Sequence, residues 1–158
     1  KINFKLPGGN GFLPHQDAPA FNSFDQTYHI TMMVSIDPCN KENGCLEIVP
    51  GHHRQGILPT AADATIDPDT AETLSWKLLP SEIGDIVFFD SYIPHRSGPN
   101  RSKQPRRALY VTYNRASEGS YRENYYRCKR DIFPPDIERD PKKDYQDSGL
   151  FNVGNPIK

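Results

Sequence analysis

Polar and apolar residues alternate along much of the chain, which is typical of β-strands with two unlike faces. Residues 1–6 alternate in this way and predict a half-buried strand. Residues 28–37 predict a longer core strand with one mostly apolar face. Its other face carries a more polar set: His29, Thr31, Met33 and Ser35. In a barrel, we expect this polar face to look into the mouth of a site.

Later segments continue the same pattern. Residues 86–89 are apolar throughout, which predicts a strand buried on both faces. Residues 106–116 predict the last strong strand, on which Arg106 and Arg107 face opposite ways. Shorter elements are also expected: strands at 46–49 and 76–79, a helical turn at 69–73, a helix at 121–131, a lid-like loop at 18–26 and an extended tail at 132–158.

Composition narrows the fold class. Fifteen Pro and eleven Gly in 158 residues favour an all-β or loop-rich fold with little helix. The length corresponds to a single domain, residues 1–158. The chain does not begin with Met but opens directly into a strand, so we expect a domain that lacks its N-terminal part.

Charge and cysteine content exclude several classes of partner. The net charge is −1, so nothing indicates a nucleic-acid or membrane surface, and there is no apolar run of about 18 residues. Three cysteines cannot all pair, and no secretory signal precedes them, which favours reduced thiols and a cytoplasmic protein. The sequence does not indicate an oligomeric state.

The candidate chemistry lies at two separated motifs. His15 and Asp17 are two residues apart, and on extended backbone such side chains point to the same face. His95, which follows the strand-like run at 85–90, is the best third partner. Two histidines and one carboxylate, with other positions left open, form the facial arrangement of non-haem Fe(II) oxygenases. We therefore predict that His15, Asp17 and His95 bind a metal.

The sequence around these motifs resembles the phytanoyl-CoA dioxygenase family of Fe(II)/2-oxoglutarate oxygenases. The resemblance covers about the first two thirds of the chain. It rests on His15-Gln16-Asp17, on Asn43-Gly44-Cys45-Leu46-Glu47-Ile48-Val49-Pro50-Gly51-His52-His53, on Gly84-Asp85, and on His95-x-Ser97 followed eleven residues after His95 by Arg106. One departure is His52, where the family usually has Ser. The resemblance implies a double-stranded β-helix, the fold also called jelly roll or cupin-like.

The same resemblance implies roles for single residues. It makes Fe(II) the metal, 2-oxoglutarate the cosubstrate and dioxygen the oxidant. Arg106 matches the position that grips the distal carboxylate of 2-oxoglutarate, Ser97 matches a position that helps it, and Asn3 matches a cosubstrate contact. Arg suits this task because its planar guanidinium meets a carboxylate with two parallel hydrogen bonds. Related halogenases lack the carboxylate ligand, so Asp17 favours hydroxylation of a small organic substrate.

Several alternatives remain open at this stage. Gln16 and Thr31 are candidate substrate contacts, although Gln16 could instead hydrogen-bond the scaffold. His29 is a rival metal ligand without a partner at ligand spacing, and adjacent His52 and His53 point apart on extended backbone. A vestigial or non-catalytic metal-binding β-barrel, and a cupin-type hydrolase or isomerase, are the alternative functions. Neither alternative requires the guanidinium of Arg106.

Overall fold

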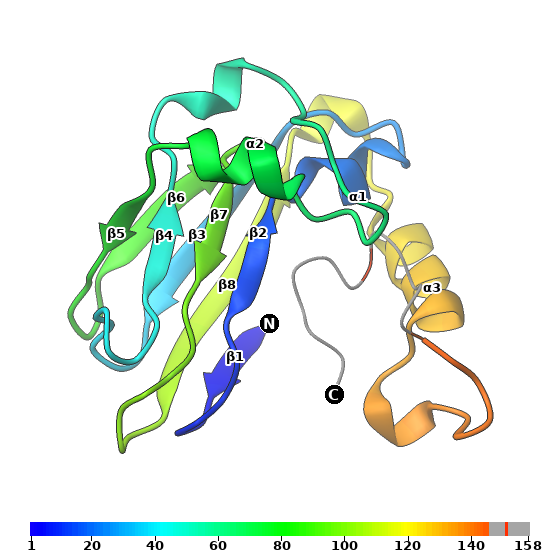
Figure 1. Ribbon diagram of the computed structural model, residues 1–158. Coiled ribbons are helices and arrows are strands. Elements are labelled where there is room, and N and C mark those ends of the chain that lie inside the picture. The colour runs from blue at the N-terminus through cyan, green and yellow to red at the C-terminus, as the bar shows by residue number, and fades with distance from the viewer. Residues whose placement is uncertain (146–150, 152–158) are drawn as a thin grey trace.

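The computed structural model describes residues 1–145 and residue 151, and these form two facing antiparallel sheets of four strands each (Figure 1). The first sheet has the order β1-β8-β3-β6, with β1 at Ile2–Lys5, β8 at Arg106–Asn114, β3 at His29–Ser35 and β6 at Ile86–Asp90. The second has the order β2-β7-β4-β5, with β2 at Phe12–His15, β7 at His95–Ser97, β4 at Leu46–Ile48 and β5 at Lys77–Leu79.

Helical elements are few and short, in agreement with the high Pro and Gly content. The α-helices are α1 at Ala18–Asn22, α2 at Pro68–Thr73 and α3 at Arg122–Ile132. Short 3₁₀ turns occur at His52–Arg54, Ala116–Glu118 and Asp136–Glu138. The expected helical turn and helix are thus present, and the expected loop at 18–26 begins with α1. No helix in the described part of the chain is long and apolar enough to cross a membrane.

The chain repeatedly crosses from one sheet to the other, and this brings distant segments together. β1 and β6 belong to the first sheet, and the strands that follow them, β2 and β7, belong to the second. β2 and β7 pair antiparallel, with His15 directly opposite His95. The strand pairing therefore places the two predicted histidine ligands side by side.

The inner face of β3 is the polar one, as predicted. Its residues alternate strictly, and His29, Thr31 and Ser35 are buried together with Met33. The hydrophobic core between the sheets is small and centres on Met33, Leu46, Phe89 and Ala108. Room is left between the sheets for a polar site.

The prediction that residues 86–89 are buried on both faces was wrong. β6 is an edge strand, and Ile86 and Phe88 are 54% and 62% exposed whereas Phe89 is buried. At the opposite edge, Ile2 and Phe4 of β1 are 48% and 64% exposed. The register places Ile2 and Ile86 in one row across β8 and β3, so these side chains lie on one surface. We call it the outer face of the first sheet: Ile2, Phe4, Ile86 and Phe88.

The described part of the expected tail at 132–158 has one 3₁₀ turn, at Asp136–Glu138. Glu138 in this turn accepts hydrogen bonds from Arg130 of α3. Residues 146–150 and 152–158 of that prediction lie outside the described residues.

Candidate metal centre and adjoining cavity

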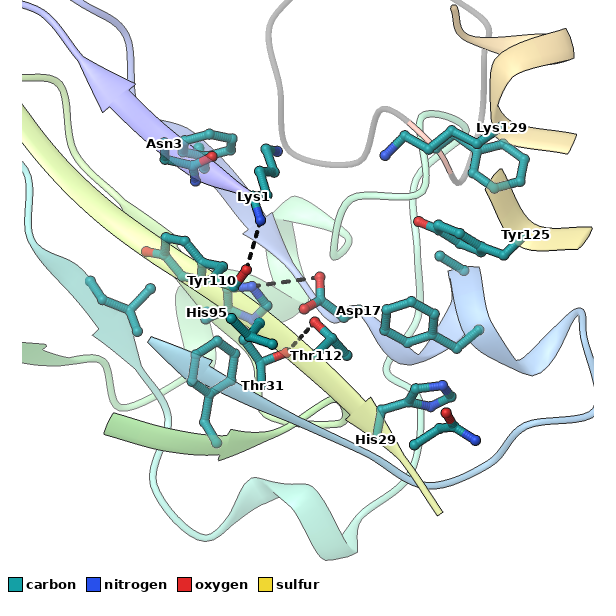
Figure 2. A pocket seen from close by; sticks show the side chains of 18 of the residues that line it. Lys1, Asn3, Asp17, His29, Thr31, His95, Tyr110, Thr112, Tyr125 and Lys129 are labelled. Carbon is teal, nitrogen blue, oxygen red and sulfur yellow. Dashed lines mark hydrogen bonds and ion pairs between the residues drawn. The ribbon is translucent and has the colours of Figure 1, made fainter. Parts of the chain in front are cut away.

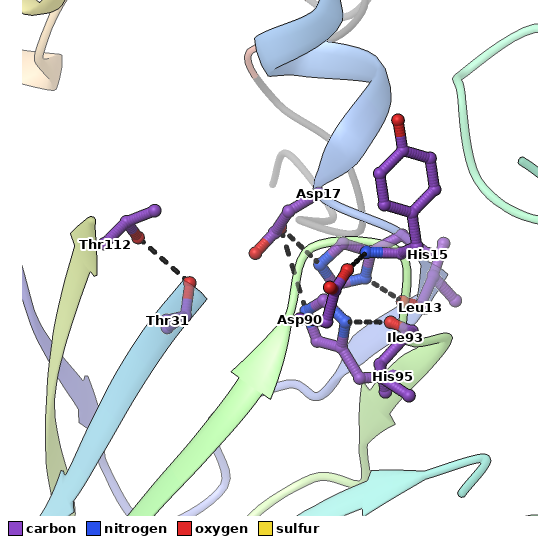
Figure 3. A network of polar contacts seen from close by, with 9 residues as sticks. Leu13, His15, Asp17, Thr31, Asp90, Ile93, His95 and Thr112 are labelled. Carbon is purple, nitrogen blue, oxygen red and sulfur yellow. Dashed lines mark hydrogen bonds and ion pairs between the residues drawn. The ribbon is translucent and has the colours of Figure 1, made fainter. Parts of the chain in front are cut away.

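The structure brings His15, Asp17 and His95 together between the two sheets (Figure 3). One potential ligand atom from each residue lies within 4.8 Å of the other two. The Nε2 atoms of His15 and His95 are both 3.8 Å from Asp17 Oδ1. This is the one such group of three His, Cys, Asp or Glu side chains within the described part of the chain.

Asp17 reaches this position by a route that the spacing argument did not foresee. His15 is the last residue of β2, but Asp17 has helical dihedrals (φ −79°, ψ −25°) and begins α1. The backbone amides of Asp17 and Ala18 both donate to the carbonyl of Ser91, at 3.0 Å. The two side chains therefore converge at a strand-to-helix turn that is tied to the segment before β7, not along one extended face.

The hydrogen bonds of the two imidazoles prepare them as metal ligands. His15 Nδ1 lies 2.7 Å from the Leu13 carbonyl and His95 Nδ1 lies 2.9 Å from the Ile93 carbonyl. A carbonyl only accepts, so Nδ1 carries the hydrogen in each ring and Nε2 offers a lone pair toward Asp17. Burial, and then the neighbouring His95, lower the pKa of His15 to about 4. His15 is therefore neutral at pH 7, as a metal ligand must be.

A cavity of about 410 Å³ opens beside this cluster (Figure 2). Asp17 and His95 lie in its wall, and so do the predicted residues Asn3, Thr31, Ser97 and Arg106. The volume is at the lower end of the range for small-molecule sites. The cavity thus joins the metal-ligand cluster to most of the residues that were predicted to contact cosubstrate and substrate.

Arg106 is a buried cation with unused hydrogen-bonding capacity. The residue is 3% exposed, and its Nη2 donates to the Gly44 carbonyl at 2.9 Å. Its Nε is buried and has no partner among the described residues. A buried guanidinium normally requires an anion, and a carboxylate at this position would meet both the charge and the free N–H.

Lys5 is a second buried cation beside Arg106, and sequence reasoning missed it. The two residues are directly opposite each other on β1 and β8. Lys5 Nζ donates to Ser97 Oγ at 2.8 Å, to the Gly98 carbonyl at 2.6 Å and to the Gly44 carbonyl at 3.2 Å. Burial, and then the charge of Arg106, lower the pKa of Lys5 to about 7. Lys5 thereby fixes the hydroxyl of Ser97, which lines the cavity.

Gln16, a predicted substrate contact, has both ends of its side chain hydrogen-bonded to backbone. Its side-chain nitrogen donates to the carbonyls of Gly56 and Tyr92, and its oxygen accepts from the Leu58 amide at 2.8 Å. Both ends of the amide are thus engaged with backbone, and Gln16 is absent from the cavity wall. These contacts favour the scaffold alternative, because Gln16 ties the segment between β2 and α1 to two loops.

The rival histidines do not join the metal-ligand cluster. His29 lines the cavity and stacks on Phe21, with ring centroids 4.1 Å apart, and its buried Nδ1 has no partner among the described residues. His52 and His53 lie in the 3₁₀ turn at His52–Arg54, away from the cavity wall. Thr31 does line the cavity, where its hydroxyl lies 3.0 Å from that of Thr112.

Comparison with known proteins agrees with this architecture. Residues 1–108 match the family model of phytanoyl-CoA dioxygenase (PhyH). A 2-aminoethylphosphonate dioxygenase from the uncultured bacterium HF130_AEPn_1 is 52% identical over 159 residues, which cover 100% of this chain and 61% of that protein. A methylphosphonate hydroxylase from Gimesia maris is 47% identical over 133 residues, which cover 84% of this chain and 50% of that protein.

Among solved structures, EvdO2 from Micromonospora carbonacea var. aurantiaca in complex with 2-oxoglutarate is similar, with a TM-score of 0.62 and 30% identity. The similarity covers 73% of this chain and 50% of that one. The chain therefore spans between half and about three fifths of the length of these relatives. The predicted family resemblance and the predicted double-stranded β-helix are both confirmed.

Proposed function

Because the chain belongs to the phytanoyl-CoA dioxygenase family, we propose that it is the Fe(II)/2-oxoglutarate-binding part of a dioxygenase that hydroxylates a small organic substrate. In this reaction 2-oxoglutarate and dioxygen are consumed, and succinate, CO2 and a hydroxylated product are released. The observation that carries the proposal is the convergence of His15, Asp17 and His95 beside a cavity whose wall holds a buried, incompletely paired Arg106.

His15, Asp17 and His95 are the proposed iron ligands. Two neutral imidazole nitrogens and one carboxylate suit Fe(II) and leave coordination positions open for cosubstrate and oxygen. The bound iron would supply the electron transfer that lets dioxygen react with 2-oxoglutarate and then with the substrate. The carbonyls of Leu13 and Ile93 hold the imidazoles in the ligand tautomer. The fixed rings then need little reorganisation when the metal binds.

Arg106 is the proposed anchor for the distal carboxylate of 2-oxoglutarate, with Ser97 and Asn3 as further contacts. Lys5 supports the anchor, because it holds the Ser97 hydroxyl and adds a second cation next to the guanidinium. Arg106 and Lys5 are only 3% and 5% exposed, so their attraction for a carboxylate is weakly screened. The cosubstrate would thereby lie between Arg106 and the metal ligands.

A small organophosphonate is the proposed substrate. Two relatives at 47–52% identity are named for 2-aminoethylphosphonate and methylphosphonate. A cavity of about 410 Å³ fits a small molecule beside the cosubstrate. Thr31 is a proposed substrate contact, and Asp17 favours hydroxylation because it occupies the position that halide requires in related halogenases. The free thiols of Cys39, Cys45 and Cys128 support a reducing, cytoplasmic setting.

One assay separates this function from its rivals. The chain is incubated with Fe(II), 2-oxoglutarate, dioxygen and 2-aminoethylphosphonate or methylphosphonate, and succinate is measured with and without the phosphonate. We expect succinate formation that depends on the phosphonate and is abolished in His95→Ala, whereas His53→Ala, outside the cavity wall, retains it. Phosphonate turnover without succinate would indicate a cupin-type hydrolase or isomerase. Metal binding without turnover of either compound would favour a non-catalytic metal-binding barrel.

A further inference from the structure

Three cationic side chains from distant parts of the sequence line the cavity: Lys1, Arg122 and Lys129. Lys1 precedes β1, while Arg122 and Lys129 are seven residues apart on α3 and so lie on one face of that helix. Figure 2 shows the ammonium groups of Lys1 and Lys129 pointing toward each other across the opening, with Tyr125 and Asp17 below them. The tertiary fold thus gathers three positive charges in the wall of one cavity.

These three side chains have no ion-pair partner among the described residues, unlike four other arginines of the chain. Arg96, Arg107, Arg130 and Arg139 all form ion pairs. Within residues 1–145 and 151, the side-chain nitrogens of Lys1, Arg122 and Lys129 make no hydrogen bond and no ion pair. Arg122 instead lies 4.9 Å from the ring of Tyr126, and Lys129 Nζ lies 5.8 Å from the ring of Tyr125. Their donors are therefore available to a ligand.

The pKa values of Lys1 and Lys129 are both lowered, so neither ammonium group has enough negative charge nearby to offset its burial. Burial, and then the charge of Lys1, lower the pKa of Lys129, and burial lowers the pKa of Lys1. Asp17 opposes both shifts, and it is the one carboxylate in the described wall of the cavity. Once a metal ion neutralises Asp17, the two ammonium groups would face each other without a counterion. An anionic ligand that binds between them would remove this repulsion.

We propose that Lys1, Arg122 and Lys129 form the subsite that binds the phosphonate group of the substrate; this proposal rests on the proposed function. A phosphonate has three oxygens and one carbon arranged tetrahedrally around phosphorus and carries between one and two negative charges near pH 7, so its oxygens can accept from three separate cationic donors. The subsite is distinct from the part of the cavity wall that holds Arg106, which is assigned with its neighbour Lys5 to 2-oxoglutarate. Cosubstrate and substrate anions would thus bind at opposite sides of the metal ligands.

The test measures binding and not turnover. Methylphosphonate is titrated calorimetrically, without oxygen, into the chain loaded with Fe(II) and 2-oxoglutarate. The variants are Lys129→Met, Lys1→Met and the charge-retaining Lys129→Arg. Arg127→Met is the matched control, because Arg127 lies on α3 but is exposed and bonded to Asn124 outside the cavity. We expect Lys129→Met and Lys1→Met each to weaken binding about 10-fold to 100-fold, whereas Lys129→Arg and Arg127→Met change it less than about threefold.

Acetate is titrated in parallel as a probe that carries one planar carboxylate, and we expect it to bind at least about 10-fold more weakly than methylphosphonate. The subsite is refuted if Lys129→Met and Lys1→Met bind methylphosphonate as well as Arg127→Met does, or if the unmodified chain does not bind it. The affinity for 2-oxoglutarate, measured on the same samples, shows that each variant is folded. A chain that binds methylphosphonate but not 2-oxoglutarate would refute the proposed function and leave the subsite standing.

Discussion

Replacement of Arg106 by Met separates the role of this side chain in cosubstrate binding from its role in folding. Met has a similar length and fits the buried space, but it removes the guanidinium that is proposed to hold the carboxylate. Loss of one partner of a buried, hydrogen-bonded charge pair costs about 2–5 kcal/mol, which corresponds to about 30-fold to several thousand-fold in affinity. Lys5 remains as a second cation directly opposite, so we expect the lower part of this range, about 30-fold to 300-fold.

The stability of the folded chain should respond very differently. Arg106→Met removes a buried charge whose Nε has no partner among the described residues, and the Gly44 carbonyl keeps its hydrogen bond from Lys5 at 3.2 Å. The large cost of breaking a buried ion pair comes from the charge left behind, and Arg106 has no carboxylate partner among the described residues that could be left in this way. We therefore expect the free energy of unfolding, measured with urea, to change by less than about 1 kcal/mol.

Arg107→Met is the matched control for this prediction. Arg107 is the neighbouring residue on β8, but its side chain is 43% exposed and pairs with Asp37 outside the cavity. Affinity for 2-oxoglutarate is measured from the weak visible charge-transfer band during anaerobic titration of the Fe(II)-loaded chain. We expect no change in Arg107→Met. An affinity of Arg106→Met within about threefold of the unmodified chain would show that Arg106 is not the anchor.

Two further predictions concern residues around this anchor. Because the pKa of Lys5 is lowered from 10.5 to about 7, the folded chain holds fewer protons than the unfolded chain between these values, and stability should rise with pH. The free energy of unfolding, measured with urea, should rise with pH less steeply in Lys5→Met, by up to about 1.4 kcal/mol per pH unit. Equal slopes in the variant and the unmodified chain would contradict this prediction. Gly44→Ala places Cβ 2.1 Å from the Gly98 carbonyl at a φ of +71°, whereas Gly51→Ala, at +81°, meets nothing within 4 Å. Thermal unfolding should therefore show a loss of about 1 kcal/mol for Gly51→Ala and about 2–4 kcal/mol for Gly44→Ala; equal losses would exclude the clash.

The sequence predicted strands well but predicted poorly which face of a strand is covered. Alternation in residues 28–37 correctly separated a polar from an apolar face of β3, and the resemblance correctly implied that the polar face looks inward. The same alternation in β1 was read as an ordinary half-buried strand, yet Asn3 and Lys5 face the interior while Ile2 and Phe4 are exposed. A period of two defines two faces, but only the arrangement of the sheets decides which one is inside.

For the candidate site, the sequence predicted which residues converge but not always how. His15, Asp17 and His95 do meet, although Asp17 does so by starting α1 and not by sharing an extended face with His15. Lys5 was missed because its pairing with Arg106 depends on β1 lying next to β8, which spacing along the chain cannot reveal. The approach of Lys129 to Lys1 is equally a product of the tertiary fold. The roles of His15, Asp17 and His95 as metal ligands, and of Arg106 as the anchor for 2-oxoglutarate, stay predictions.

The outer face of the first sheet has a practical consequence for any experiment in solution. Ile2, Phe4, Ile86 and Phe88 present apolar side chains to water at both edges of the sheet, and exposed apolar edges tend to associate. A net charge of only −1 gives little long-range repulsion between molecules to oppose this. Self-association of the chain should therefore increase strongly with protein concentration. Light scattering at each titration point is needed to separate ligand binding from self-association.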